Sequence, residues 1–130
     1  MKEKNKTYKI LLVDDDKFLL DMYSTKFNEK GFDVTSVFGG TEALSKLEEG
    51  LDPEIILTDV VMPVMDGFEF LAEIQKKKLV PHASIIILSN LGQKEDFDKG
   101  AELGADGYIV KATSTPTEVV NKVLQIVESK

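Results

Sequence analysis

The side chains of this sequence that could perform chemistry are several carboxylates, one hydroxyl and one ammonium group, and each follows a short apolar run. Carboxylates that converge on one crevice repel one another, so at least one pKa would rise unless a cation lay between them. A divalent cation site made of oxygen ligands resolves this repulsion, and Mg²⁺ fits such a site. A Lys and a Ser beside the carboxylates could then hold a transient anion through an ion pair and a hydrogen bond. The residues concerned are Asp14, Asp15, Asp16, Asp59, Ser89 and Lys111.

Helix capping is the ordinary explanation for an Asp near the start of a helix, and we expect it for Asp16 and Asp66. It does not explain Asp59, which starts no helix and heads a loop that runs through Val60 and Met65. A Ser or a Lys at the end of a strand is common and is usually only solvated. Together with the acids, however, the Ser and the Lys form a set that specifically indicates a site for a transient anion.

The elements that must position these residues are predicted by the spacing of apolar residues. Three of five Ile-, Val- and Leu-rich runs are continuously apolar, which is typical of strands covered on both faces. The run from Phe32 to Val37 alternates, as an edge strand does. The five expected strands are Tyr8 to Val13, Phe32 to Val37, Glu54 to Thr58, Ser84 to Leu88 and Gly107 to Val110.

The segments between the strands carry apolar residues at helical spacing. One of these helices, Gln93 to Leu103, has few large apolar residues and an interior Gly100 that costs about 1 kcal/mol relative to Ala, so we expect it to be the loosest element. The last helix opens with a capping box and a Pro at its first position. The expected helices are Asp16 to Lys30, Thr41 to Glu49, Asp66 to Lys77, Gln93 to Leu103 and the segment from Thr115 onward.

Strands that alternate with helices predict an α/β fold, a doubly wound five-stranded parallel sheet with right-handed crossovers and helices on both faces. Such a sheet binds ligands outside the carboxyl ends of its strands. The chain has 130 residues, 42% of them hydrophobic and 30% charged, and its length fits one domain. The chemically interesting residues follow the strands, so we expect them to meet at one edge of this sheet.

The composition excludes several classes of function. The chain has no Cys, which excludes disulfides, Cys-ligated zinc and thiol chemistry. Its net charge is −7 and every basic residue is Lys, so we expect no direct binding to nucleic acid. No apolar run is long enough to span a membrane, and no signal peptide is evident. We therefore expect a cytoplasmic protein without a membrane segment.

Four motifs of this sequence resemble those of the receiver domain of two-component response regulators, the family of the single-domain chemotaxis regulator. The resemblance implies a flavodoxin-like strand order, 2-1-3-4-5, with a receiver domain over residues 8–130 after a polar tail of residues 1–7. The motifs are Ile10-Leu-Leu-Val-Asp14-Asp15, Leu57-Thr-Asp59-Val-Val-Met-Pro63-Val-Met-Asp66-Gly67, Ile87-Leu-Ser89 and Gly104-Ala-Asp-Gly107-Tyr108-Ile-Val-Lys111.

By this resemblance Asp59 accepts a phosphoryl group from a sensor histidine kinase or a phosphotransfer protein, with Mg²⁺ as cofactor. Ser89 and Lys111 would hold the phosphoryl oxygens. Such a domain is not an enzyme with an external substrate, because it would catalyse only its own phosphorylation and a slow dephosphorylation. The expected ligands of the metal are Asp14, Asp15, Asp59 and the backbone carbonyl of Val61.

The resemblance also implies which residues respond to phosphorylation and which surface then binds a partner. Tyr108 is the expected aromatic switch, which acts together with Ser89. The face formed by the fourth helix, the fifth strand and the fifth helix would bind a downstream protein or a second copy, with Phe97 and Tyr108 as contacts. A lone aromatic in a helix can equally belong to the core. Val61 and Leu91 are expected to flank the path of the attacking water, and both are apolar, which predicts a long-lived phosphoprotein.

Two residues depart from the family pattern. Ala112 follows Lys111 where Pro is usual, often in a cis peptide bond, so we expect a trans bond and an altered loop. Asn90 follows Ser89 where Ala or Gly is usual. It could narrow access to the phosphoryl group or hydrogen-bond to it, and the sequence leaves both roles open.

Two other classes of protein compete with this interpretation. A small haloacid-dehalogenase-like phosphatase would use Asp14 as its nucleophile and Asp16 as a general acid. That family also requires an acidic pair beyond the Lys, where only Glu118 and Glu128 remain. A flavin carrier of similar topology would need a neutral phosphate-binding loop after the first strand, where this chain places three acids.

Overall fold

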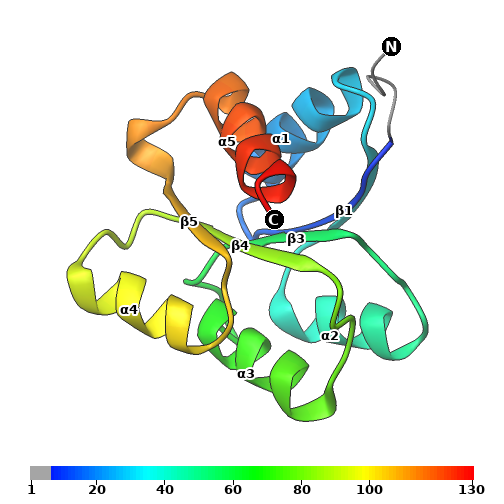
Figure 1. Cartoon of the computed structure of the whole chain (residues 1–130), viewed down its shortest axis with the longest axis vertical. Helices are drawn as coiled ribbons and strands as arrows, with labels where there is room; N and C mark the ends of the chain where they lie inside the picture. The colour runs from blue at the N-terminus through cyan, green and yellow to red at the C-terminus, as the bar shows by residue number, and fades with distance from the viewer. Residues whose placement is uncertain (1–6) are drawn as a thin grey trace.

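The computed structural model describes residues 7–130, and its five strands form one parallel sheet in the order β2-β1-β3-β4-β5 (Figure 1). The α/β class and the strand order predicted from the sequence are thereby confirmed. Except for Thr7, the expected N-terminal tail lies outside the described residues. The strands are β1 Lys9–Val13, β2 Asp33–Val37, β3 Ile55–Thr58, β4 Ser84–Ser89 and β5 Gly107–Val110.

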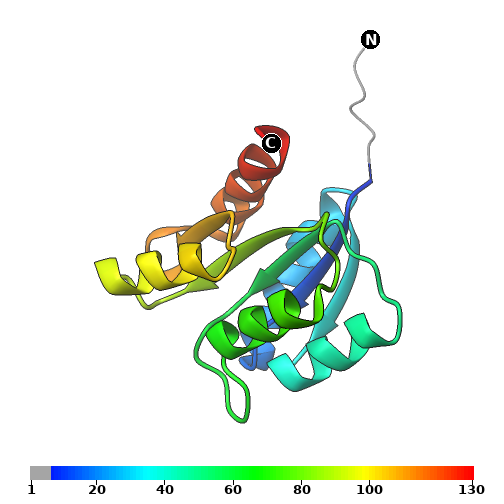
Figure 2. The ribbon, with the colours of Figure 1, turned by 60° about the horizontal axis from the view of Figure 1, so that its bottom comes forward.

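The helices cover both faces of the sheet. α1 and α5 lie on one face, and α2, α3 and α4 lie on the other (Figures 1 and 2). None of the helices in residues 7–130 has the length and apolar character needed to cross a membrane. The helices are α1 Lys17–Glu29, α2 Gly40–Glu48, α3 Gly67–Lys77, α4 Lys94–Glu102 and α5 Pro116–Glu128, with a 3₁₀ turn η1 Lys111–Thr113 after β5.

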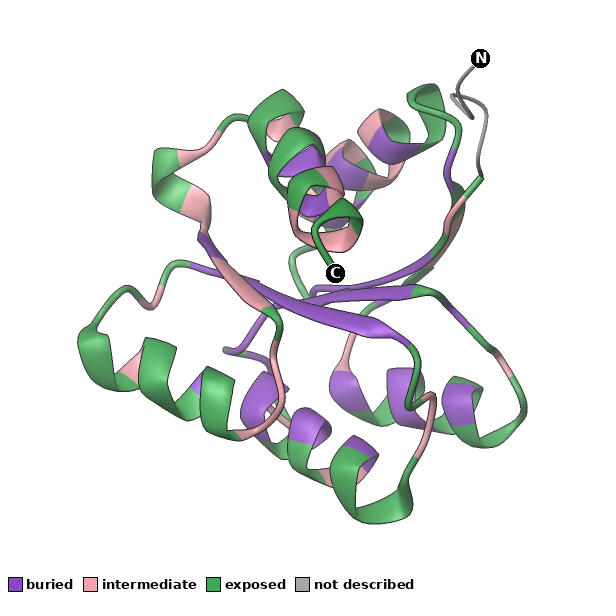
Figure 3. Ribbon diagram, viewed as in Figure 1, coloured by how far each residue is buried: buried purple, intermediate pink, exposed green. Residues whose placement is uncertain are grey.

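The core consists of two apolar clusters, one on each face of the sheet (Figure 3). Successive residues of a strand point to opposite faces. Leu11 and Ile87 therefore join the cluster under α2 and α3, whereas Leu12 and Ile86 join the cluster under α1 and α5. This two-sided burial is why the central strands are continuously apolar. The edge strand β2 is buried only at its end, at Val37.

The helix starts confirm the predicted caps. The Asp16 side chain accepts a hydrogen bond from the backbone N of Leu19 at 3.1 Å. Asp66 and Glu69 form a reciprocal capping box at the start of α3, and Thr115 forms another with Glu118 at the start of α5. Each such cap contributes about 1 kcal/mol and fixes where the strand-to-helix loop ends.

The α4 helix is attached to the sheet by a close approach of its backbone. Gly100 is its one buried residue, and a Cβ atom at this position would lie 2.8 Å from Cδ1 of Ile87. The sequence predicted this glycine only as a cost to the helix. The structure adds that the absence of a side chain lets α4 lie directly on β4 and on Tyr108.

Candidate functional site

The fold brings together side chains from the carboxyl ends of four adjacent strands. Asp14 follows β1, Asp59 follows β3, Ser89 is the last residue of β4, and Lys111 follows β5. The register places Val13 beside Thr58 and Ser89 beside Val110, so these strands end at the same level. The predicted meeting of the polar residues at one edge of the sheet is confirmed.

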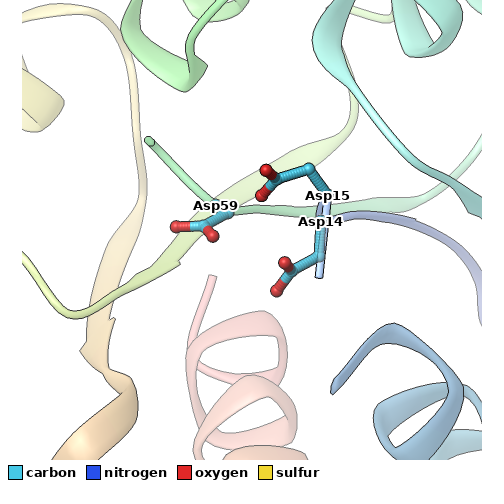
Figure 4. Close-up of side chains that lie close together, drawn as sticks. All are labelled: Asp14, Asp15 and Asp59. Carbon is cyan, nitrogen blue, oxygen red and sulfur yellow. The ribbon is translucent and has the colours of Figure 1, made fainter. Parts of the chain in front are cut away.

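Three carboxylates form a cluster at this edge (Figure 4). One carboxylate oxygen from each of Asp14, Asp15 and Asp59 lies within 4.8 Å of the others. Asp14 and Asp59 are buried, and Asp15 is exposed. Asp16 stands apart because its side chain caps α1. Mg²⁺ favours oxygen ligands from one or two carboxylates and keeps several waters, so a cluster with one solvent-facing member fits this ion.

The Lys111 ammonium group lies between two of these carboxylates. Its Nζ donates hydrogen bonds to Oδ2 of Asp14 at 2.7 Å and to Oδ2 of Asp59 at 2.9 Å. The Lys111 side chain is only 8% exposed. Two carboxylates and one ammonium leave one excess negative charge in this buried group, which a divalent cation would offset.

The pKa values of this group reflect both burial and pairing. Burial raises the pKa of the Asp14 carboxyl above its usual value, against the opposing effect of its hydrogen bonds with Lys111 and with the backbone N of Asp16. Burial acts to lower the pKa of the Lys111 ammonium, but hydrogen bonds with Asp14 and Asp59 outweigh it and leave that pKa above its usual value. Lys111 therefore stays charged at neutral pH.

The loop after β3 holds Asp59 in place. Oδ1 of Asp59 accepts a hydrogen bond from the backbone N of Val60 at 2.7 Å. The backbone N of Gly67 donates to the carbonyl O of Val60 at 2.7 Å, which closes the loop. A Cβ atom on Gly67 would lie 2.2 Å from the carbonyl O of Asp59. Gly67 is part of the motif quoted above, but this close approach is visible only in the folded chain.

Ser89 lies at the start of a hydrogen-bond network toward α4. Its Oγ accepts from the backbone N of Leu91 at 3.2 Å, and the Tyr108 hydroxyl donates to the carbonyl O of Leu91 at 2.6 Å. The Tyr108 and Phe97 rings meet edge to face, with their centroids 4.7 Å apart. Phe97 is 39% exposed, so it is a surface residue that packs against Tyr108 and does not belong to the core. Burial raises the pKa of Tyr108, and the charge of Asp96 adds to this effect.

The structure gives Asn90 a role that the sequence did not suggest. Its Oδ1 accepts a hydrogen bond from the backbone N of Ala112 at 2.8 Å. The described chain contains no cis peptide bond, in accordance with the expectation for Ala112. Val61, which follows Asp59 by two residues in the sequence, is 61% exposed. The unusual identities of Asn90 and Ala112 were the available signal, but their contact depends on how two loops meet.

The comparisons with known proteins agree with this geometry. The family model for the response regulator receiver domain matches residues 10–124. The Vibrio cholerae chemotaxis protein CheY4 has a TM-score of 0.85 and 29% identity, over 93% of this chain and 99% of that one. The receiver domain of the Francisella response regulator 1452 has a TM-score of 0.83 and 33% identity, over 94% of this chain and 98% of that one.

Two curated relatives are longer regulatory proteins. The CpxR homolog of Haemophilus influenzae, a transcriptional regulatory protein, is 43% identical over 103 residues, which are 79% of this chain and 43% of that protein. The regulatory protein VanRc of Enterococcus gallinarum is 36% identical over 116 residues, 88% of this chain and 48% of that protein. This chain thus spans less than half of either relative.

The chain belongs to the response regulator receiver domain family. Receiver domains are the phosphoacceptor domains of two-component systems, in which response regulators interact with histidine kinases. They are signalling domains and not classical enzymes, and they bind Mg²⁺ at an acidic cluster of the kind that Asp14, Asp15 and Asp59 form here.

Proposed function

We propose that Asp59 is the residue that accepts the phosphoryl group, from a sensor histidine kinase or a phosphotransfer protein. In this transfer a carboxylate oxygen of Asp59 forms a bond to phosphorus, and the phosphorus–nitrogen bond of a phosphohistidine breaks. The electron pair of that bond stays on the imidazole nitrogen, which takes up a proton from solvent, so a neutral histidine side chain is released. The observation that carries the proposal is the Lys111 ammonium bound to Asp59, because negative charge increases beside this cation when a phosphoryl group arrives.

The charge balance supports a requirement for a divalent cation. Each added negative charge about 4 Å from Asp14 costs about 4 kcal/mol at an effective dielectric constant near 20. Lys111 supplies one positive charge, which Asp14 and Asp59 already share. When bound, Mg²⁺ supplies two further positive charges, which offset the negative charges of the phosphoryl group. Its proposed ligands are Asp14, Asp15, Asp59 and the backbone carbonyl of Val61.

Ser89 and Lys111 are the proposed binding groups for the phosphoryl oxygens. Lys111 is already positioned against Asp59 and supplies an ammonium group with three donors. The Ser89 hydroxyl accepts a hydrogen bond from Leu91 N and keeps its own proton, so it can donate to an anion on Asp59.

The proposed output runs through Tyr108 to the face formed by α4, β5 and α5. A Ser89 hydroxyl drawn toward a phosphoryl group moves away from Tyr108 and leaves space that the ring can occupy. The ring is packed against Phe97 and bonded to Leu91, so its movement changes the surface around Phe97. A downstream protein or a second copy of the chain would bind there. The whole chain has a net charge of −7 and no Arg, which argues against direct contact with nucleic acid.

The proposed exchange would take place in the cytoplasm. Hydrogen exchange with and without a phosphoryl analogue tests the route to the output face. Changes in protection are expected to concentrate between Ser89 and Lys111. A response confined to the carboxylate cluster would refute the proposed route.

Intact-mass measurement tests the phosphoacceptor. The purified chain, incubated with a small acyl phosphate donor and Mg²⁺, should gain the mass of one phosphoryl group, and a chelator should abolish the gain. Asp59→Asn should remain unmodified. The haloacid-dehalogenase alternative expects the reverse, with modification of Asp59→Asn and none of Asp14→Asn, because its nucleophile is Asp14. Normal modification of Asp59→Asn overturns the assignment.

A further inference from the structure

The side chain of Asn90 connects the two loops that carry the phosphoryl-binding residues. Ser89 and Val110 are the last paired residues of β4 and β5. One residue beyond Ser89, Oδ1 of Asn90 accepts a hydrogen bond from the backbone N of Ala112 at 2.8 Å. A side chain thus continues the connection between the strands at the point where the backbone ladder stops. The bond spans 22 positions in sequence, so it joins two segments that are far apart along the chain.

This bond fixes the backbone on the far side of Lys111. The residue before Lys111, Val110, is held to β4 by the ladder, and the residue after it, Ala112, is held to the end of β4 by Asn90, which follows the strand directly. The backbone N of Ser114 also donates to the carbonyl O of Lys111 at 3.2 Å, which closes the short turn η1. Both peptide neighbours of Lys111 are therefore attached to the same strand.

The position of this backbone determines where the ammonium group lies. A Lys side chain has four rotatable bonds, so holding it in one geometry costs rotamer entropy. Nζ of Lys111 must nevertheless reach two carboxylates that come from different strands, at 2.7 and 2.9 Å. A shift of the Lys111 backbone would spoil one of these contacts, because Asp14 and Asp59 are themselves buried and fixed.

We propose that Asn90 is a positioning residue, which through Ala112 holds the Lys111 ammonium in the geometry that receives a phosphoryl group. The inference rests on the proposed function of Asp59. Asn90 and Ala112 are both exposed, so the loss of one hydrogen bond between them leaves the core intact. Its effect falls on the freedom of the β5–α5 turn and hence on Lys111.

The direct test measures the mobility of the Lys111 side chain by nuclear magnetic relaxation of its labelled ε-carbon. Asn90→Ala should lower the order parameter of this group. Asn90→Asp keeps an Oδ acceptor for Ala112 N and should leave the group ordered. Asn121→Ala, at an exposed position on α5, is the matched control and should have no effect. An unchanged order parameter in Asn90→Ala overturns the proposal.

The kinetic test is a double-mutant cycle with a small acyl phosphate donor and saturating Mg²⁺. Asn90→Ala should slow phosphorylation of Asp59 about fivefold, the change that corresponds to one lost hydrogen bond. In a Lys111→Ala background the same substitution should have no further effect, because Asn90 acts through Lys111. An equal slowing in both backgrounds overturns the proposal. A wild-type chain that gains no phosphoryl group on Asp59 overturns the proposed function instead, and the relaxation measurement still decides the role of Asn90.

Discussion

Replacing Lys111 with Met removes the cation that contacts both Asp14 and Asp59, and we predict a large loss of stability in the absence of Mg²⁺. Met keeps most of the apolar length of the side chain, so the substitution chiefly removes charge. The Nζ of Lys111 lies 2.7 Å from Oδ2 of Asp14 and 2.9 Å from Oδ2 of Asp59. At an effective dielectric constant near 20 each contact contributes about 6 kcal/mol of Coulomb attraction.

The net effect is smaller than this attraction because burying the ammonium group costs desolvation energy, which the substitution restores. Breaking a buried ion pair by removing one partner typically costs about 3 to 5 kcal/mol, since it leaves an uncompensated charge. The Asp14 carboxyl, whose pKa burial already raises, can also respond by taking up a proton, which limits the loss. We therefore expect Lys111→Met to lower the free energy of unfolding by about 3 kcal/mol at neutral pH.

Urea unfolding measures this loss of stability. We choose far-ultraviolet circular dichroism to follow it, because the chain has no Trp to report unfolding by fluorescence. Lys94→Met is the matched control. Lys94 pairs with Asp98 at 2.8 Å, but its side chain is 86% exposed, so its loss should change stability by less than about 1 kcal/mol. Mg²⁺ should restore much of the stability of Lys111→Met, by about 2.7 kcal/mol at a hundredfold excess over its Kd. If the two variants lose equal stability in chelator, the charge argument is refuted.

Four other predictions concern the loops around the site and the start of α5. Val64 has φ of 70°, is 93% exposed and is the central residue of a tight turn, so Val64→Gly should raise the free energy of unfolding by about 1 kcal/mol in urea titrations. Gly67→Ala places a Cβ 2.2 Å from a backbone carbonyl and should lower the same quantity by about 3 kcal/mol; an unchanged unfolding midpoint would contradict the close approach. Val61→Asn combined with Leu91→Glu should speed loss of phosphate in a time course by intact mass, since polar side chains can orient the attacking water, and slower decay counts against this mechanism. The capping hydrogen bonds of Glu118 hold the pKa of its carboxyl below the usual 4.5, so its contribution to stability is present above that value and lost as pH falls through the lowered pKa; in Glu118→Gln the Tm should lose this part of its pH dependence, and an unaltered profile would refute it.

Much of the fold and of the candidate site was predictable because the relevant signals are local. The continuous apolar runs identify strands such as β1 and β4 whatever lies around them, and capping residues such as Asp16 and Asp66 act within one helical turn. The carboxyl ends of parallel strands meet at one edge of a sheet, so the approach of Asp59 to Lys111 follows once five strands and their direction are known. The predicted edge strand was also correct, because alternation reports one-sided burial.

The features that the sequence did not reveal depend on where separate segments meet. From the sequence, Gly100 is only a residue that weakens its helix, and its packing against β4 is visible only in the folded chain. Asn90 is likewise only a bulky neighbour of Ser89 in the sequence. In the structure, the turn after β5 brings the backbone N of Ala112 within 2.8 Å of the Asn90 side chain. The burial that shifts the pKa of Asp14 is likewise a property of the folded chain. The residues proposed to perform the chemistry can therefore be predicted from the sequence. The residues that fix the geometry of Lys111 cannot, because they act through contacts between loops. Substitutions near Asn90 should accordingly tune the rate of phosphorylation while the carboxylate cluster itself remains unchanged.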